Sequence, residues 1–261
     1  MDIKSERSEG NKKFSEEAFA RSRALLGEPA FQRLVASHVL LFGLGGVGGY
    51  ACDALARSGV GTLSLVDMDR YAFSNLNRQP GAFLDSIGLK KTEVMARRIR
   101  GMRGDGCQLF LFSERVEPQK GERFFQMGDR LPDLVIDAID DMDGKLEIIR
   151  LCALYKIPLL LCGGCGRRLD PSKLRFAELS KTSDDPLLKR LRRLCREKQY
   201  ASIETLYSIE AARSLIPGAE GPSSMIFVPA SAGLMLASRA VSFLCEGEPV
   251  RVPVHRPPEE K

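Results

Sequence analysis

The chain has 261 residues, of which 44% are hydrophobic and 28% charged, which suits one large α/β domain or two small ones. Its 39 lysines and arginines exceed its 34 acids only mildly, so the charge permits an acidic partner such as RNA without requiring one. No apolar run approaches the roughly 18 residues that span a bilayer, and seven scattered cysteines argue against a disulfide framework, so we expect a cytoplasmic protein without a membrane segment.

Strands and helices are predicted to alternate along the first two thirds of the chain. Residues 1–13 are polar and expected to be disordered, and residues 14–36 predict a helix broken near Gly27. The elements predicted next are strand 38–42, helix 46–58, strand 62–67, helix 89–101, strand 107–112, helix 119–127, strand 134–138, helix 143–155 and strand 158–162. Apolar residues at consecutive strand positions are typical of a parallel sheet that is buried on both faces. The pattern therefore predicts a Rossmann-like, doubly wound α/β fold.

The pattern changes after residue 166. The stretches KLRFAEL and SIETLYSI are typical of strands, and DDPLLKRLRRLCREK predicts a helix capped by Asp184 or Asp185. PASAGLMLASRAVSFL predicts an apolar helix that ends near Cys245. We expect a single domain over 14–245, with this added C-terminal strand and helix region, and a flexible tail over 246–261.

The stretch HVLLFGLGGVGG combines an apolar strand, a glycine turn and the start of a helix. Gly43, Gly45 and Gly48 match the G-x-G-x-x-G pattern of nucleotide-binding turns. Glycine permits positive φ and lets backbone N–H groups approach phosphate oxygens. Asp67 ends the next strand, where a carboxylate can accept hydrogen bonds from ribose hydroxyls. These residues predict a nucleotide site, but they leave NAD, ATP and a turn without a ligand open.

The loop after the second strand favours ATP. A second acid, Asp69, precedes a polar loop with Ser74, Asn75 and Arg78, and Lys91 begins the next helix. A reacting triphosphate needs cations on its oxygens, whereas the pyrophosphate of NAD is held mostly by backbone. Arg78 offers a planar fork and Lys91 a point charge. Each residue alone would be better interpreted as a solvated surface side chain, and it is the surrounding sequence that favours a triphosphate site.

Four carboxylates fall at the end of the fourth strand, at positions 137, 140, 141 and 143. Open α/β sheets bind their ligands at strand carboxyl ends, and Mg²⁺ is held there by one or two carboxylates together with phosphates. We assign this magnesium site to Asp140. Asp137 is interpreted as structural, and Asp143 as the N-cap of the next helix.

Five motifs in this order resemble the ubiquitin-activating-enzyme-like, or ThiF/MoeB-type, superfamily of adenylating enzymes: GLGGVGG, LVDMD, SNLNRQ, IGLKK and DAIDD. Members of that superfamily bind ATP on this turn and form acyl-adenylates. A narrower resemblance runs from about residue 14 to residue 245, through CGGCGRRLDPSKL, ELSKTSDDPL and FVPASAGLMLAS. These motifs are similar to the bacterial tRNA threonylcarbamoyladenosine dehydratase family. The resemblance implies an ATP- and Mg²⁺-dependent cyclisation of threonylcarbamoyladenosine next to the tRNA anticodon, through an acyl-adenylate.

The resemblance also implies a role for each site residue. The implied catalytic residues are Arg78, Lys91 and Asp140, with Asp140 as the metal ligand. The implied nucleotide-binding residues are Gly43, Gly45, Gly46, Gly48, Asp67, Asp69, Ser74, Asn75, Arg78, Lys91, Asp140 and Asp141. It further implies a homodimer in which Arg21 or Arg23 of the other subunit reaches the γ-phosphate, and a sulfur-transfer protein partner.

Three other functions remain open: an adenylyltransferase for a ubiquitin-like sulfur carrier, an NAD-dependent oxidoreductase, and a non-catalytic RNA-binding scaffold. Cys162 and Cys165 form one C-x-x-C pair, half of a tetrathiolate zinc site, and the pattern favours close packing over a redox pair. In the helix over 184–198, Lys189, Arg192 and Arg196 share a face, which suits RNA contact and a solvated helix equally well.

Overall fold

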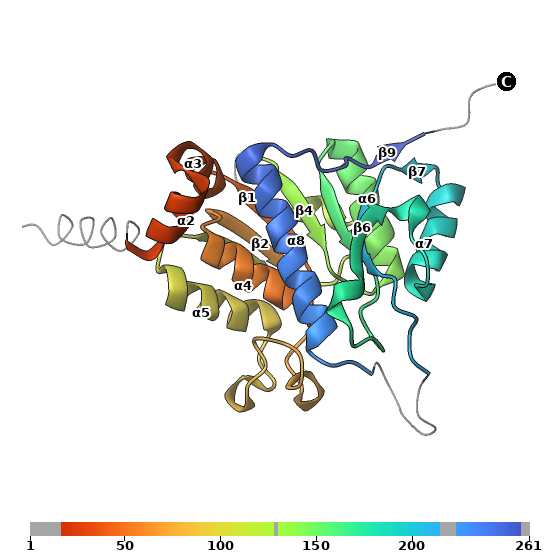
Figure 1. Ribbon diagram of the computed structural model, residues 1–261, viewed down its shortest axis with the longest axis horizontal. Coiled ribbons are helices and arrows are strands. Elements are labelled where there is room, and N and C mark those ends of the chain that lie inside the picture. The colour runs from red at the N-terminus through yellow and green to blue at the C-terminus, as the bar shows by residue number, and fades with distance from the viewer. Residues whose placement is uncertain (1–16, 128–129, 215–222, 257–261) are drawn as a thin grey trace, which may run out of the picture.

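A seven-stranded sheet forms the centre of the computed structural model, which describes residues 17–127, 130–214 and 223–256 (Figure 1). Its strands are β1 (His38–Phe42), β2 (Thr62–Val66), β3 (Gln108–Phe112), β4 (Leu134–Asp137), β5 (Leu159–Cys162), β6 (Leu174–Glu178) and β8 (Glu204–Ser208). The strand order is β3-β2-β1-β4-β5-β8-β6, and every neighbouring pair is parallel except β6 and β8. The predicted doubly wound, mainly parallel α/β fold is confirmed.

Helices cover both faces of this sheet (Figure 1). One face carries α3 (Glu28–Val35), α4 (Gly48–Ser58), α5 (Lys91–Arg103) and α8 (Phe227–Glu246), and the other carries α6 (Met142–Tyr155) and α7 (Pro186–Glu197). A short helix, α2 (Ala20–Leu26), precedes α3 at the edge where β1 begins.

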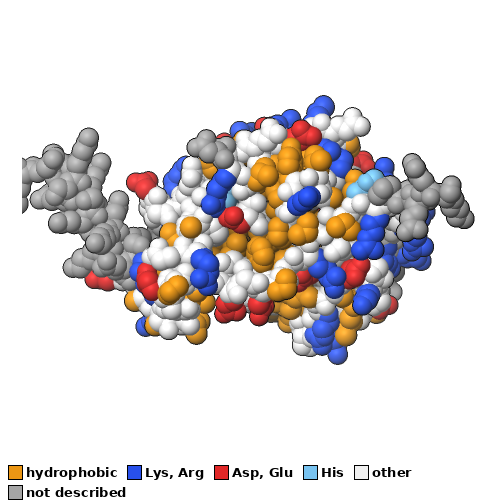
Figure 2. Space-filling model, turned by 90° about the horizontal axis from the view of Figure 1, so that it is seen from above, with side chains coloured by type: hydrophobic (Ala, Val, Ile, Leu, Met, Phe, Trp, Pro, Cys, Tyr) orange, Lys and Arg blue, Asp and Glu red, His pale blue; other side chains and the backbone are white. Residues whose placement is uncertain are grey.

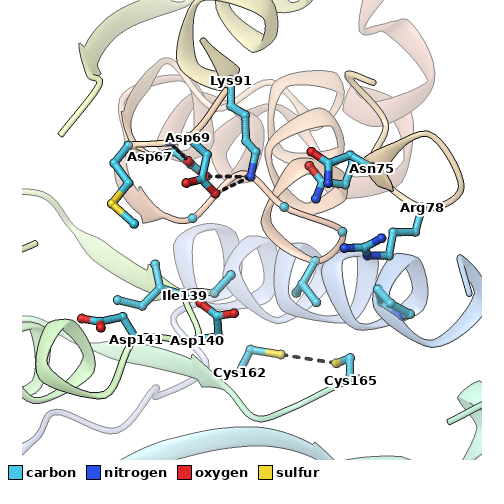
Figure 3. Close-up of a pocket in the computed structure, with 18 of the residues that line it drawn as sticks. Asp67, Asp69, Asn75, Arg78, Lys91, Ile139, Asp140, Asp141, Cys162 and Cys165 are labelled. Atoms are coloured by element: carbon cyan, nitrogen blue, oxygen red, sulfur yellow. Dashed lines mark hydrogen bonds and ion pairs between the residues drawn. The ribbon is translucent and has the colours of Figure 1, made fainter. Parts of the chain in front are cut away.

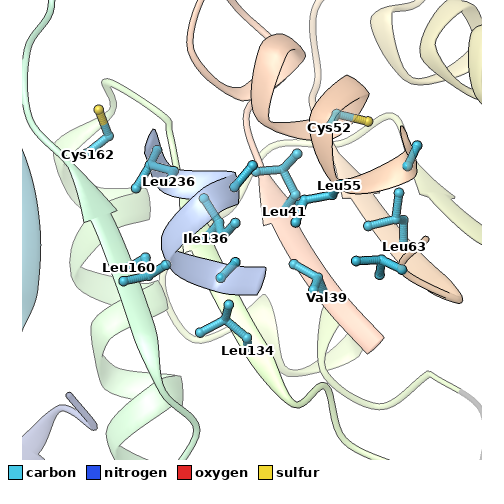
Figure 4. Packing of buried hydrophobic residues seen from close by; sticks show 14 of the residues in the cluster. Val39, Leu41, Cys52, Leu55, Leu63, Leu134, Ile136, Leu160, Cys162 and Leu236 are labelled. Carbon is cyan, nitrogen blue, oxygen red and sulfur yellow. The ribbon is translucent and has the colours of Figure 1, made fainter. Parts of the chain in front are cut away.

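Alternate residues of β1 enter two separate cores, which explains why the strand is apolar at every position from Val39 to Phe42. Val39 and Leu41 pack with α4 and α8, while Leu40 and Phe42 pack with α6. Figure 4 shows Leu236 of α8 lying over the sheet among the side chains of the core that contains Val39 and Leu41. Burial of each such side chain contributes roughly 1.5–3 kcal/mol before the loss of conformational entropy is counted.

Among the described residues, α8 is the one helix long and apolar enough to cross a membrane by length and composition. It packs against α4, however, and eight of its residues are buried. A Cβ at Gly233 would collide with the backbone carbonyl of Val47, so this glycine sets the close approach of the two helices. We interpret α8 as a core helix.

Two predicted helix boundaries need correction. The helix expected over 119–127 is a single 3-10 turn, Gly121–Phe124. Gln119 has a φ of 62°, outside the right-handed helical region, so no helix can include residue 119. Helix α6 is capped by Asp141, whose Oδ2 accepts a hydrogen bond from Gly144 N at 2.8 Å, and not by Asp143.

The chain beyond residue 245 packs more than its composition suggests. Val250 is buried, and the carbonyl of Arg251 accepts a hydrogen bond from Leu159 N at 3.1 Å. A short strand, β9 (Val254–His255), then pairs with β7 (Tyr200–Ala201). The segment over 1–13 that was expected to be disordered lies outside the described residues.

Candidate functional site

The carboxyl ends of β1, β2, β4 and β5 open into a cavity of about 530 Å³ (Figure 3). It lies where the strand order reverses between β1 and β4, the position at which doubly wound sheets bind ligands. Of the residues predicted for the site, ten line this cavity: Gly43, Gly45, Gly46, Asp67, Asp69, Asn75, Arg78, Lys91, Asp140 and Asp141. Gly48 and Ser74 lie beside it without lining it.

The glycine turn forms one wall of the cavity, and two of its positions accept only glycine. Gly43 has a φ of 87°, and a Cβ there would lie 2.8 Å from the carbonyl oxygen of Ala138. A Cβ at Gly48 would collide with the carbonyl of Gly43, so Gly48 allows α4 to start directly against the end of β1. Gly45 and Gly46 thus present their backbone to the cavity, while Gly48 serves packing.

Asp67, Asp69 and Lys91 form an ion-pair cluster at the end of β2 (Figure 3). The ammonium of Lys91 lies 2.8 Å from Asp69 Oδ2 and 3.9 Å from Asp67 Oδ2. Asp67 also accepts hydrogen bonds from Leu44 N at 2.6 Å and Asp69 N at 2.8 Å, which fixes the carboxylate against the glycine turn. Burial raises the pKa of Asp67, and the charge of Lys91 opposes that rise.

A loop from the end of β2 to α5 places Arg78 at the opposite side of the cavity (Figure 3). One Arg78 nitrogen, Nη1, donates to the carbonyl of Ser74 at 2.8 Å and to Asn77 Oδ1 at 2.9 Å. Asn75 Oδ1 accepts from Ala72 N at 3.1 Å and stabilises the turn from which this arginine projects. Ser74 therefore positions Arg78 through its backbone, and the rest of the guanidinium remains available to an anion.

Adjacent acids at the end of β4 have different environments. In Figure 3, Asp140 points toward the cavity and Asp141 points away from it. Both oxygens of Asp141 are engaged, one with Gly144 N at 2.8 Å and the other with Arg115 Nη2 at 2.6 Å. Among the residues drawn in Figure 3, none is hydrogen-bonded or ion-paired with Asp140.

Asp137 forms a fully buried ion pair with Lys145 beneath the site, which supports its structural interpretation. The Lys145 ammonium lies 3.0 Å from Asp137 Oδ1 and donates to the carbonyl of Cys162 at 3.0 Å. Burial raises the pKa of Asp137, and the adjacent ammonium of Lys145 opposes that rise. The pair ties the ends of β4 and β5 together behind the cavity.

Several residues that line the cavity were not predicted from the sequence. Gln79 is only 8% exposed, and its Oε1 has no hydrogen-bond partner among the described residues. Arg115 brings a further cation to the wall, and Met68, Val116 and Ile139 supply an apolar part. Gln79 stands within the SNLNRQ motif and could have been found there, whereas no pattern marks the others.

The basic residues that were predicted to contact phosphate or RNA from outside the cavity lie on two helices, α2 and α7. Arg23 of α2 donates to Glu28 at 2.8 Å and stacks over Phe31, while Arg21 is exposed on the same helix. Helix α2 lies near the edge where β1 begins, away from the cavity of its own chain (Figure 1).

Helix α7 starts at the cavity, which its residue Leu187 lines. Seen from above, several Lys and Arg side chains lie on the right of the molecule, the side on which Figure 1 shows α7 (Figure 2). Lys189 and Arg196 are exposed. Arg192 is half-buried and donates to the carbonyl of Thr182 at 2.7 Å, so it is tied to the preceding loop and does not share their solvent-facing surface.

Most of the chain matches a known protein family. The model of the ThiF family matches residues 19–253. The chain belongs to the ThiF family. The glycine turn, Asp67, Lys91 and the acidic end of β4 all fall within the matched range.

Within the ThiF family, the chain is similar to proteins named tRNA threonylcarbamoyladenosine dehydratase. One, from Escherichia coli K12, is 40% identical over 174 residues, which are 67% of this chain and 63% of that protein. The alignment therefore spans less than two thirds of that relative. Another, from Bacillus subtilis 168, is 33% identical over 239 residues, covering 85% of this chain and 92% of the relative. A crystal structure of the E. coli enzyme in complex with ATP superimposes with a TM-score of 0.81 at 33% identity, covering 89% of this chain and 95% of that one.

Proposed function

We propose that this protein catalyses the ATP-dependent dehydration of threonylcarbamoyladenosine in tRNA. The threonyl carboxylate attacks the α-phosphate of ATP, pyrophosphate leaves, and an acyl-adenylate forms. A nucleophile of the carbamoyl group then closes a ring on the acyl carbon and expels AMP. The observation that carries the proposal is the convergence of Lys91, Arg78 and Asp140 on one cavity over a glycine turn. The proposal is also supported by the similarity to the E. coli tRNA threonylcarbamoyladenosine dehydratase that was crystallised with ATP.

The protein's contribution to this reaction is positioning and electrostatic stabilisation. The buried Asp67 carboxylate, fixed by Leu44 N and Asp69 N, would hold a ribose hydroxyl at the end of β2. Lys91 and Arg78 would offset the charge that develops on the phosphates as pyrophosphate departs. Met68, Val116 and Ile139 offer an apolar wall against which a nucleobase can lie. The reaction requires no nucleophile from the protein.

A magnesium ion fits the residues present at the end of β4. Mg²⁺ prefers one or two carboxylates together with phosphate oxygens and water. Asp140 lines the cavity and would hold it, whereas the oxygens of Asp141 are occupied by Gly144 and Arg115. When bound, the ion would neutralise part of the triphosphate charge.

The remaining partners are part of the same proposal. We place the protein in the cytoplasm as a homodimer, in which Arg21 of the other subunit is the better candidate for reaching the γ-phosphate. Arg23 is less suited because Glu28 and Phe31 already hold it. A sulfur-transfer protein partner rests on the family resemblance alone.

The proposal is tested with the purified chain, ATP, Mg²⁺ and tRNA bearing threonylcarbamoyladenosine. We expect AMP and pyrophosphate to form only with the modified tRNA, and mass spectrometry of the tRNA nucleosides to detect the cyclic product. Unmodified tRNA is the matched control. Adenylation of a sulfur carrier ending in Gly-Gly, with no response to tRNA, would instead establish the carrier-activating function. Binding of NAD without affinity for ATP would exclude both.

A further inference from the structure

Two cysteines lie in the wall of the cavity, in the glycine-rich loop that follows β5. The Sγ atoms of Cys162 and Cys165 are 3.8 Å apart and face one another (Figure 3). All seven cysteines fall in the described part of the chain, and of these only Cys162 and Cys165 line the cavity. The pair is therefore the one set of thiols that a small molecule entering the nucleotide cavity would meet.

The loop can bring the two sulfur atoms together by moving mainly at its second cysteine. A disulfide has an S–S length of about 2.05 Å, so the sulfurs must approach by about 1.8 Å. The first half of the loop is anchored, since Gly163 N donates to Leu206 at 2.8 Å and Gly164 N donates to Asp185 at 2.7 Å. Arg168 Nη1 also donates to the carbonyl of Gly164 at 2.6 Å, whereas its hydrogen bond to the carbonyl of Gly166, directly beyond Cys165, is longer, at 3.4 Å. A Cβ built at Gly166 would lie 3.5 Å from the Ser223 carbonyl oxygen, an ordinary contact, so we expect Cys165 to move more readily than Cys162.

A line of hydrogen bonds connects this movable half to Arg78. Arg167 N donates to the carbonyl of Ser223 at 2.8 Å, and the next carbonyl, that of Ser224, accepts from Asn77 Nδ2 at 2.8 Å. The same Asn77 accepts from Arg78 Nη1 at 2.9 Å through its Oδ1. Contraction of the cysteine loop therefore pulls on the segment that positions the cavity's arginine.

We propose that Cys162 and Cys165 are an oxidisable dithiol, and that their disulfide form weakens the binding of nucleotide in the cavity. The oxidant is a peroxide small enough to enter. The Cys165 thiol loses its proton and the thiolate attacks one peroxide oxygen; the O–O bond breaks, the leaving hydroxide takes up that proton as water, and a sulfenic acid remains on Cys165. The Cys162 sulfur then attacks the Cys165 sulfur and displaces hydroxide, so that two thiols and one hydrogen peroxide give one disulfide and two waters.

The roles of the two cysteines follow from their positions. The hydrogen bond with Cys165 and complete burial hold the pKa of Cys162 well above its usual range, which suits the resolving thiol better than the attacking one. The backbone of Cys162 is also fixed, because its carbonyl accepts a hydrogen bond from the buried Lys145. A bound nucleotide would cover the cavity and should slow the oxidation of the pair.

The disulfide itself is tested on the full chain, treated with hydrogen peroxide and then alkylated. Trypsin should release residues 157–167, which hold both cysteines and no other. We expect this peptide to resist alkylation and to lack two hydrogen atoms, and dithiothreitol should reverse both effects. Cys165→Ser should abolish the change, whereas Cys107→Ser, outside the cavity, should leave it intact. Full alkylation of the native peptide after peroxide treatment would overturn the proposal.

The effect on the cavity is measured in two ways, because the nucleotide part rests on the proposed function. Hydrogen exchange should become faster in residues 74–79 and 223–227 of the oxidised chain, which needs no ligand. The dissociation constant of ATP should rise about tenfold, as expected for a loss of roughly 1.4 kcal/mol, and return with dithiothreitol. Unchanged exchange in both segments would overturn the proposal. Failure of the reduced chain to bind ATP would count against the proposed function alone.

Discussion

The ammonium of Lys91 lies 2.8 Å from the carboxylate of Asp69 at the mouth of the cavity. Lys91 is almost fully buried, whereas half of the Asp69 side chain is exposed to solvent. Water can solvate the exposed Asp69 carboxylate when it leaves Lys91, and the buried Asp67 carboxylate remains 3.9 Å from the ammonium. A phosphate can therefore replace Asp69 as the partner of Lys91 with little loss of free energy. Without a nucleotide, Asp69 holds the Lys91 ammonium in position.

We expect Lys91→Ala to lower kcat/KM for the tRNA reaction by about 10²–10³-fold, the usual effect of removing one group that stabilises transition-state charge. AMP release with modified tRNA measures it. Lys90→Ala is the matched control, because Lys90 is the neighbouring lysine, half-buried, and pairs with Glu93 at 3.3 Å instead of with the acids of the cavity. Equal activity of both variants and the native chain would remove Lys91 from the catalytic site.

Asp140→Asn should raise the Mg²⁺ concentration that gives half-maximal activity by about tenfold, because a neutral amide binds the cation less well than a carboxylate. The measurement is a magnesium titration of AMP release at fixed ATP. Asp143→Asn is the control, since Asp143 is an exposed acid on the first turn of α6. A magnesium response that shifts in the control and not in Asp140→Asn would contradict the assignment.

The sequence predicted the sheet and most of the cavity because both depend on local patterns. The apolar run of β1 and the glycine turn after it require only residues that are adjacent along the chain. The link from Arg167 through Ser223 and Asn77 depends instead on segments about 150 residues apart, which no spacing rule connects. The cap of α6 was misplaced because acids stand at both 141 and 143; Asp141 caps the helix through Gly144 N, and its other oxygen pairs with Arg115, a residue that lies 26 positions earlier in the chain.

The buried pair of Asp137 and Lys145 should be necessary for stability only because each residue neutralises the other. We expect Lys145→Met to lower the free energy of unfolding by about 3–5 kcal/mol, since it leaves a carboxylate buried without a counter-charge. Adding Asp137→Asn should recover most of this loss, because the amide can still accept the hydrogen bond from Ile139 N. Urea unfolding followed by circular dichroism measures both, as the chain has no tryptophan. A double variant no more stable than Lys145→Met would refute this interpretation.

His38 should make the protein less stable in mild acid. Burial lowers the pKa of His38 from 6.5, and its Nε2 lies 2.8 Å from Ser64 Oγ. Well above pH 6.5 the imidazole is neutral in both the folded and the unfolded chain, so it adds no pH dependence there. As the pH falls below that value, the unfolded chain binds a proton first, and stability falls until the folded state is protonated as well. His38→Gln should therefore flatten the urea midpoint below pH 6.5, whereas His255→Gln, at an exposed position, should not. Parallel curves for the native chain and His38→Gln would show that another group carries the effect.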